Sequence, residues 1–322
     1  MNFPVFDLHC DTAWKMLGEG MQLTGQLLSN DGHIDLNRAG KLPGYAQCFA
    51  CFTAPMELFP EGYAPAGITP ADMFEREMIV LLRELEKNAG QIRLAYTAED
   101  VRQNLKSGVM SAILTIEGTA GVGYDPMLLQ DLHGVGFRMT TLGWNEKNPL
   151  CGSHKTGGGL TELGKDYLLE AERLGMIVDV SHCSDEAFWD IIELAEKPVI
   201  ASHSNSRAVC DCSRNITDDM FRAICRTGGV AGINLYAHFV GENADVDRIC
   251  DHIFHFLELD PECDHIALGG DLDGCEELPR GFGGIDDYPK IARRLLERGL
   301  DEKTIRKIYC ENALGVMETC CM

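Results

Sequence analysis

Five side chains of the kind that binds transition metals follow short apolar runs of the chain. They are His9, Asp11, Glu117, His182 and His203. His9 and Asp11 form a His-x-Asp pair, and because alternate residues of an extended segment point the same way, both can bind one ion. Imidazole nitrogens mixed with carboxylates favour Zn²⁺ or a related transition metal over Mg²⁺ and Ca²⁺, which prefer oxygen ligands.

This donor set is larger than one tetrahedral ion requires, above all if one position is kept for water. Glu117 can bridge two ions about 3.5–4 Å apart, and such a pair lowers the pKa of a shared water and polarises a carbonyl oxygen. Hydrolysis is therefore the expected chemistry. A single His or Glu at any one of these positions would more often be structural, so this hypothesis depends on all five lying together.

The candidate ligands can meet only if distant segments of the chain end at one place. Short β-rich apolar runs alternate with longer segments of helical period, which is typical of βα units and a parallel sheet. Eight of the runs have the continuous apolar character of strands buried on both faces. They are Pro4–Leu8, Ala46–Thr53, Ser111–Ile116, Gly136–Thr141, Met176–Ser181, Pro198–Ser202, Gly229–Asn234 and His265–Gly269.

Between the expected strands lie segments of helical period, each long enough to cover a strand. They are Pro70–Asn88, Thr161–Leu174, Ser184–Ala195, Thr217–Arg226, Asp245–Leu257 and Asp286–Arg298. This alternation predicts a (β/α)8 TIM-type barrel, with residues 1–322 forming a single metal-dependent hydrolase domain. Asp301–Lys307 and Glu311–Glu318 are expected to form extra C-terminal helices. Gly18–Gly44 is Gly-rich and is expected to form a loop or small hairpin outside the barrel.

The expected barrel explains how the candidate ligands come together. In such barrels the active site is built at the carboxyl ends of the strands. His9 and Asp11 follow the first strand, and the other three ligands follow later ones. Asp271 follows the eighth strand in a Gly-rich turn and joins them as a sixth candidate. Because five strands deliver such side chains to one barrel mouth, the sequence predicts a metal site there.

The composition argues against several classes of function. The chain has 28 Lys and Arg against 50 Asp and Glu, a net charge of −22, so we expect neither nucleic acid nor a membrane as a partner. No stretch approaches the about 20 apolar residues of a membrane span, and no basic segment precedes an apolar one at the start. The 14 Cys lie scattered in apolar runs rather than in a disulfide framework. We therefore expect a cytoplasmic protein.

Seven stretches of the sequence carry a resemblance to a known family. They are DLHCDT, IEG, FRMTTLGWN, GLTELGKDYLLEAERLGMIVDVSH, PVIASHSNSRAVCDCSRNITDD, HIALGGDLDG and YCENALGVM. Through them nearly the entire chain resembles the membrane dipeptidase family, also called renal dipeptidase, of binuclear zinc peptidases in the amidohydrolase superfamily. The resemblance implies two Zn²⁺ ions, one held by His9, Asp11 and Glu117, and the other by Glu117, His182 and His203.

The same resemblance implies an activity and further site residues. A hydroxide bridging the two metals would attack the amide bond of a free dipeptide, including one with a C-terminal D-residue, with Glu117 and Asp271 as catalytic residues. Asp271 would transfer the proton and contact the substrate, and Arg214 would bind its terminal carboxylate. A guanidinium grips a carboxylate through two parallel hydrogen bonds, which suits an enzyme restricted to very short peptides. The family also suggests a homodimer.

One position departs from the family pattern. Many members carry a His in the loop after the fourth strand, and the corresponding residue here is Trp144. Indole donates one N–H but cannot take up a proton, so Trp144 is expected to shape the substrate pocket. Tyr236 is a second pocket candidate, with core packing as its alternative. His154, in the following Gly-rich loop, is a weaker candidate to reach the site, because surface loops commonly carry His.

Two alternatives to a dipeptidase stay open at this point. A different amidohydrolase-type reaction, such as deamination or hydrolysis of an ester or lactone, would use Asp271 as a metal ligand. A catalytically silent metal-binding scaffold is the second, because Trp144 stands where an imidazole is usual. Retention of both Asp271 and Arg214 argues against the scaffold.

Overall fold

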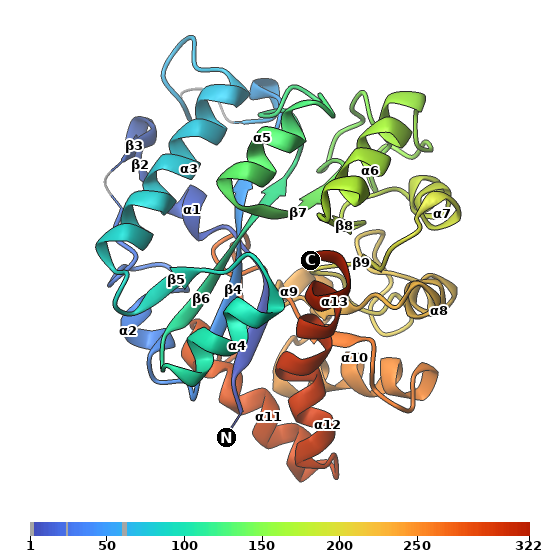
Figure 1. The fold of residues 1–322 in the computed structure, drawn as a ribbon. Helices are drawn as coiled ribbons and strands as arrows, with labels where there is room; N and C mark the ends of the chain where they lie inside the picture. The colour runs from blue at the N-terminus through green and yellow to red at the C-terminus, as the bar shows by residue number, and fades with distance from the viewer. Residues whose placement is uncertain (1–2, 24, 60–62) are drawn as a thin grey trace.

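Parallel strands form a ring surrounded by helices (Figure 1). The computed structural model describes residues 3–23, 25–59 and 63–322. In that part of the chain the ring consists of β1 (Val5–Cys10), β4 (Tyr45–Phe52), β6 (Met110–Glu117), β7 (Phe137–Thr141), β8 (Ile177–Asp179), β9 (Val199–Ile200), β10 (Ala231–Ile233) and β11 (Ile266–Leu268). Their order around the ring is β10-β11-β1-β4-β6-β7-β8-β9. A parallel bridge between Ala201 and Ala231 joins β9 to β10.

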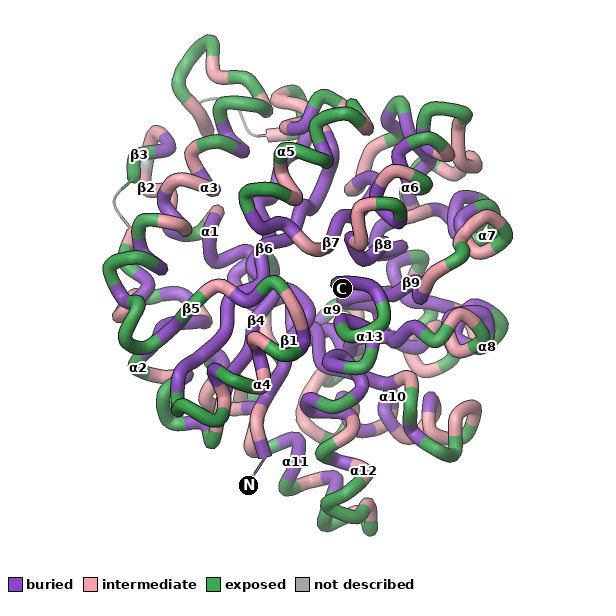
Figure 2. Tube along the Cα trace, in the orientation of Figure 1, coloured by how far each residue is buried: buried purple, intermediate pink, exposed green. Residues whose placement is uncertain are grey.

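The ring confirms the predicted (β/α)8 barrel, and each of the eight predicted strands overlaps an observed one. The strands form where the sequence is apolar on both faces, and β1, β4 and β6 are buried along their whole length (Figure 2). A further short strand, β5 (Ile92–Leu94), pairs with β6 outside the ring. No run long enough or apolar enough marks β5 in the sequence.

The helices cover the outside of the barrel (Figure 1). Those on the predicted segments are α3 (Pro70–Lys87), α6 (Glu162–Leu174), α7 (Asp185–Leu194), α8 (Asp218–Thr227), α10 (Val246–Leu259) and α11 (Tyr288–Glu297). Thr69, Thr161, Ser184, Thr217 and Asp245 accept hydrogen bonds from the first turns of five of these helices, which fixes where each one begins.

Two covering helices were not predicted, α4 (Ala98–Lys106) and α5 (Leu128–Val135). A capping box formed by Thr97 and Asp100 begins α4, so a local signal for this helix was present in the sequence. By contrast, α5 is short and includes Gly134, and the residue at its N-cap, Met127, makes no side-chain cap. Helix α5 therefore depends on packing against the barrel rather than on its own sequence.

The C-terminal segment closes the end of the barrel opposite the strand carboxyl ends. It consists of α12 (Glu302–Arg306), a π-helical turn (Lys307–Glu311) and α13 (Asn312–Cys320). The two predicted C-terminal helices are thus joined without a break. Apolar residues of α13, among them Leu314 and Met317, pack in one cluster with interior side chains of the strands, such as Phe6 and Ile113. The end of the barrel at the strand carboxyl ends therefore remains open for a functional site.

The Gly-rich segment after β1 lies outside the ring, as predicted. A two-stranded hairpin of β2 (Leu17–Gly18) and β3 (Gln22–Leu23) is followed by the short helix α2 (Leu36–Ala39). In the part of the chain described here, no helix combines the length and apolar character that crossing a membrane requires.

Candidate metal centre and substrate cavity

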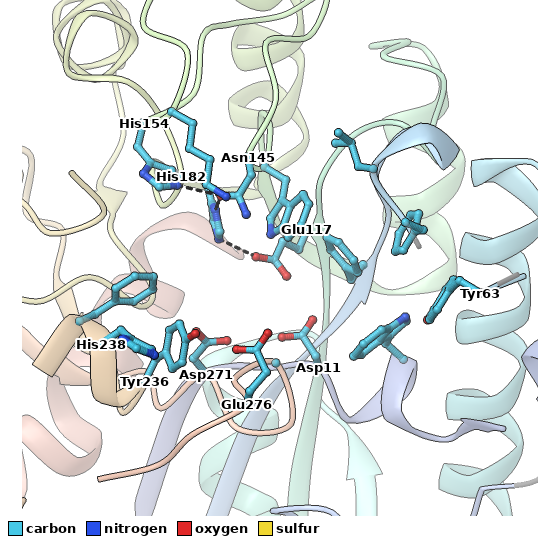
Figure 3. A pocket seen from close by; sticks show the side chains of 18 residues that line it. Asp11, Tyr63, Glu117, Asn145, His154, His182, Tyr236, His238, Asp271 and Glu276 are labelled. Carbon is cyan, nitrogen blue, oxygen red and sulfur yellow. Dashed lines mark hydrogen bonds and ion pairs between the residues drawn. The ribbon is translucent and has the colours of Figure 1, made fainter. Parts of the chain in front are cut away.

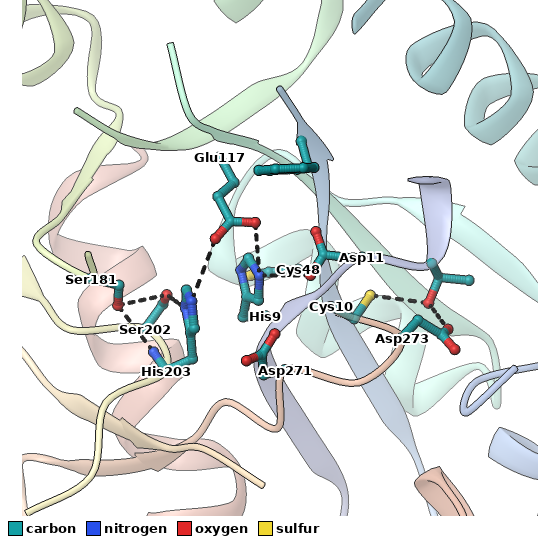
Figure 4. Close-up of polar contacts among 12 residues, drawn as sticks. His9, Cys10, Asp11, Cys48, Glu117, Ser181, Ser202, His203, Asp271 and Asp273 are labelled. Atoms are coloured by element: carbon teal, nitrogen blue, oxygen red, sulfur yellow. Dashed lines mark hydrogen bonds and ion pairs between the residues drawn. The ribbon is translucent and has the colours of Figure 1, made fainter. Parts of the chain in front are cut away.

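The six predicted site residues lie together at the carboxyl ends of the strands (Figures 3 and 4). His9 belongs to β1 and Glu117 is the last residue of β6. His182, His203 and Asp271 follow β8, β9 and β11. Asp11 comes directly after β1, two residues beyond His9. All six are at most 9% exposed, so their polar atoms must be paired with one another or with a ligand.

Glu117 faces two groups of donors with its two oxygens. Its Oε2 lies 3.3 Å from His9 Nε2, which in turn lies 3.2 Å from Asp11 Oδ2. Its Oε1 lies 3.0 Å from His182 Nε2 and 3.5 Å from His203 Nε2. The carboxylate therefore stands between two sets of donors, which is the arrangement that a residue bridging two cations requires.

The donor atoms fit divalent cations in both distance and chemistry. Ligands about 2.0–2.1 Å from a tetrahedral ion lie about 3.3 Å apart, which matches the separations around Glu117. His182 Nε2 and His203 Nε2 lie only 3.1 Å apart, and Asp11 Oδ1 is buried without a hydrogen-bond partner. Gly274 leaves room beside them, because a Cβ there would lie 2.1 Å from Asp11 Oδ2.

Hydrogen bonds made by the Nδ1 atoms of His182 and His203 orient the two rings, so that the Nε2 atom of each ring faces Glu117. Asn145 Oδ1 accepts from His182 Nδ1 at 3.0 Å. Ser202 Oγ donates to Asp179 Oδ2 and therefore accepts from His203 Nδ1, at 2.6 Å. Both Nε2 atoms are thus left unprotonated in the neutral rings, the form in which imidazole binds a metal.

Ser202 provides a test of this orientation. We expect Ser202→Ala to weaken metal binding about 10- to 100-fold, because His203 loses the acceptor that fixes its tautomer and ring position. Competition with a chromophoric chelator measures the change directly. Ser206→Ala is the matched control, since Ser206 is also buried but its Oγ has no hydrogen-bond partner in the structure. Equal metal affinity in both variants would contradict the role given to Ser202.

The backbone is strained where two of these side chains are presented. His182 has φ of 70° and Asp271 has φ of 55°, both in the left-handed region that residues other than Gly, Asn and Asp rarely adopt. Gly118, which follows Glu117, has φ of 71°, and a Cβ there would lie 2.0 Å from the carbonyl oxygen of Thr53. Only glycine at 118 lets β6 end with Glu117 pointing into the site.

Burial and neighbouring charges shift the pKa values within the site. Burial by itself would raise the pKa of Glu117, but the charge of His9 holds it well below its usual value. Burial, together with the charge of Arg214, lowers the pKa of His182 to about 3. Burial raises the pKa of Asp271 to about 6, against the opposing charge of His9. Glu117 is therefore a carboxylate and His182 a neutral imidazole near neutral pH.

A cavity of about 730 Å³ opens above these residues, and Asp11, Glu117, His182 and Asp271 form part of its lining (Figure 3). The two pocket candidates from the sequence, Trp144 and Tyr236, both line it as well. Tyr236 therefore lies at the cavity surface and not in the core, the alternative considered from the sequence. The volume is in the range of about 300–1,000 Å³ typical of small-molecule sites.

Arg214 does not line this cavity but a smaller pocket beside it, and His182 lines both. Arg214 is 4% exposed, and its Nη1 donates to Ser204 Oγ at 2.7 Å. Its Cζ lies 5.8 Å from the ring centroid of Phe239, a residue of the main cavity. The Nε and Nη2 atoms have no partner. These two share the edge of a guanidinium that grips a carboxylate with parallel hydrogen bonds.

Sequence reasoning missed the residues that orient the ligands. Asn145 accepts from His182 and also from His154 Nε2, at 2.8 Å, and Ser213 Oγ lies 2.9 Å from His154 Nδ1. His154 therefore reaches the cavity and contacts a metal-site histidine through Asn145. Asn145 ends the stretch FRMTTLGWN, and Ser202 directly precedes His203, but only the tertiary contacts reveal what the two side chains do.

Comparison with known proteins identifies relatives of this chain. A protein of Klebsiella pneumoniae, described only by its position in the pqqA 5′ region, is 32% identical over 263 residues, which cover 77% of this chain and 96% of that protein. An uncharacterized dipeptidase of Schizosaccharomyces pombe is 34% identical over 217 residues, 65% of this chain and 53% of that protein.

The fold also matches a solved metallopeptidase of Rhodobacter sphaeroides, whose structure contains a phosphinate mimic of the dipeptide L-Ala-D-Ala. The TM-score is 0.88 at 26% identity, and the match covers 99% of this chain and 100% of that one. Residues 1–321 match the family described as "Membrane dipeptidase (Peptidase family M19)". The chain therefore belongs to the membrane dipeptidase family.

Proposed function

We propose that the protein is a zinc-dependent dipeptidase that hydrolyses the amide bond of free dipeptides. The observation that carries this proposal is the pairing of two features. Glu117 stands between two donor sets that fit divalent cations, and the buried Arg214, close to His182, has its carboxylate-binding edge unpartnered. The donor sets around Glu117 suit the cleavage of an amide, and the unpartnered edge of Arg214 suits a substrate with a free C-terminus.

His9, Asp11 and Glu117 would hold one Zn²⁺, and Glu117, His182 and His203 the other. The mixed imidazole and carboxylate set favours zinc over the harder cations. When bound, the two ions would supply polarisation of the scissile carbonyl and a lowered pKa for the attacking water. The strand ends fix these ligands before substrate arrives, since their backbones belong to the barrel.

Asp271 is the proposed proton carrier. Its Oδ2 accepts a hydrogen bond from Asn234 Nδ2 at 3.0 Å, which leaves Oδ1 on the side toward Gly274 and the cavity. From there Asp271 takes a proton from the attacking water and returns it to the nitrogen of the leaving amine, so that one residue acts as base and then as acid. Arg214 holds the terminal carboxylate and places the amide over Glu117.

The proposed substrates include dipeptides with a C-terminal D-residue. The mimic bound to the Rhodobacter sphaeroides relative, L-Ala-D-Ala, is of this type, and that relative matches nearly the whole of this chain. Arg214 would grip the carboxylate of either stereoisomer, because the fork of hydrogen bonds does not depend on the configuration of the neighbouring carbon.

Amine release from a panel of peptides tests the proposal. We expect the zinc-loaded enzyme to cleave L,L and L,D dipeptides, and to cleave matched tripeptides and C-terminally amidated dipeptides at least about 100-fold more slowly. Esters, lactones and amino-substituted heterocycles belong in the same panel. His9, Asp11 and Asp271 also place donor atoms within 4.8 Å of one another, the arrangement that a reaction with Asp271 as a ligand would use. Turnover of those compounds without dipeptide cleavage would replace the dipeptidase by that alternative.

A further inference from the structure

Four aromatic side chains contact one another in a ring on one side of the cavity, and one of them, Phe52, also contacts Trp144 at 4.9 Å. Trp14 stacks on Tyr63 with 5.9 Å between ring centroids, and Tyr63 stacks on Phe59 with 4.9 Å. Phe52 contacts Phe59 at 6.1 Å and Trp14 at 6.3 Å, in both cases edge to face. All four line the cavity, and we refer to them as the aromatic wall.

The aromatic wall is assembled from separate parts of the chain. Trp14 lies in α1 (Thr12–Lys15), Phe52 ends β4, and Phe59 follows a 3₁₀ turn. Ring separations of about 4.5–7 Å are those that aromatic pairs favour, so the wall is held in place by its own contacts. None of the four participates in the proposed metal binding or proton transfer, which leaves their clustering at this cavity unexplained by the chemistry alone.

The wall stands opposite the groups that surround Arg214. Tyr236 contacts the rings of His238 and Phe239 at 5.0 Å and 4.8 Å, and Phe239 lies against the Arg214 guanidinium. Figure 3 shows Tyr63 and His238 on opposite sides of the cavity, with Glu117 and Asp271 between them. A dipeptide with its carboxylate on Arg214 and its amide over Glu117 therefore extends its N-terminal residue toward the wall.

We propose that the aromatic wall binds the side chain of the N-terminal residue, and that the preferred substrates are dipeptides with a large apolar or aromatic residue at that position. This inference rests on the proposed dipeptidase function, because the carboxylate on Arg214 sets the direction of the substrate. Phe59 and Tyr63 are only partly buried, so ring surface remains free for contact. Burying an apolar side chain against that surface removes both from water.

Two series of dipeptides test the inference, X-Ala and Ala-X, with X as Ala, Leu, Phe or Trp. We expect kcat/KM to rise at least about 10-fold from Ala-Ala to Phe-Ala, since even one methylene in an apolar pocket is worth about that factor. The rise from Ala-Ala to Ala-Phe is expected to be smaller. A preference that follows the C-terminal residue would overturn the proposal.

Variants of the wall separate this effect from general damage to the site. Tyr63→Ala and Phe59→Ala are expected to bring the ratio of kcat/KM for Phe-Ala over Ala-Ala close to one, while the ratio for Ala-Phe over Ala-Ala stays as in the parent. Trp189→Ala, at a 40% exposed aromatic of α7, is the matched control and leaves both ratios unchanged.

The possible outcomes are distinguishable. An unchanged Phe-Ala preference in both wall variants would overturn the assignment of the wall while the dipeptidase function stands. If the zinc-loaded enzyme cleaves none of these dipeptides, the proposed function itself fails, and the inference fails with it.

Discussion

His182→Ala is expected to lower kcat/KM for dipeptide hydrolysis at least about 1,000-fold while the barrel stays folded. His182 Nε2 lies 3.0 Å from Glu117 Oε1, so its removal leaves the second donor set with Glu117 and His203 alone. Two donors hold a zinc ion poorly, and the loss of carbonyl polarisation costs about 4 kcal/mol or more of barrier lowering. Peptidase assays and elemental analysis of the purified variant give the two readouts, with bound metal falling from two ions per chain to one.

Because His182 has a left-handed backbone, His203→Ala serves as a second variant of the same donor set. Thermal unfolding followed by circular dichroism checks that both remain folded. His133→Ala, at a histidine of α5 that does not line the cavity, is the matched control and keeps full activity. A His182→Ala enzyme that binds one metal and retains full activity would refute the assignment of two ions.

Arg214→Ala is expected to lower kcat/KM for free dipeptides about 30- to 5,000-fold and to remove the preference over C-terminally amidated dipeptides. The variant loses a buried charge-assisted pair with the substrate carboxylate, a loss of about 2–5 kcal/mol. Amidated substrates never make that pair, so their slow cleavage should change little. The ratio of kcat/KM for the free and amidated forms is therefore the informative measurement.

Arg214→Lys separates charge from geometry. Lysine keeps the positive charge but cannot form the two parallel hydrogen bonds of a guanidinium, so we expect an intermediate ratio. Equal cleavage of free and amidated dipeptides by the parent enzyme would contradict the role of Arg214, whatever the variants do. Thermal unfolding of each variant shows whether the bond from Arg214 to Ser204 also supports the fold.

The barrel and the convergence of the candidate ligands could be predicted because their signals are local. A run of apolar residues that ends in His or Glu predicts both a strand and a candidate site residue at its carboxyl end, as at Ile116 and Glu117. The parallel topology then brings all such ends to one mouth without any knowledge of individual contacts. Family resemblance added the division of ligands between two ions, which stays a proposal.

Contacts between distant segments could not be predicted in the same way. The hydrogen bond from His182 Nδ1 to Asn145 Oδ1 joins positions 37 residues apart, and no spacing in the sequence relates them. The same holds for the aromatic wall, because none of its four members stands out in the sequence when taken alone. Arg214 was identified by its motif. Its position beside the Phe239 ring, in the smaller pocket next to the main cavity, depends on how the loop after β9 folds.

The burial of Arg214 has a consequence for how substrates reach the enzyme. The charge of Arg214 attracts a substrate carboxylate only after the substrate has entered the site. The net charge of −22, by contrast, repels approaching anions out to about one Debye length, roughly 8 Å at physiological ionic strength. A zwitterionic dipeptide carries no net charge and diffuses in without opposition. A dipeptide with an acidic side chain carries a net negative charge and is slowed before it can touch the guanidinium, so the electrostatic field of the protein disfavours acidic dipeptides at the encounter step.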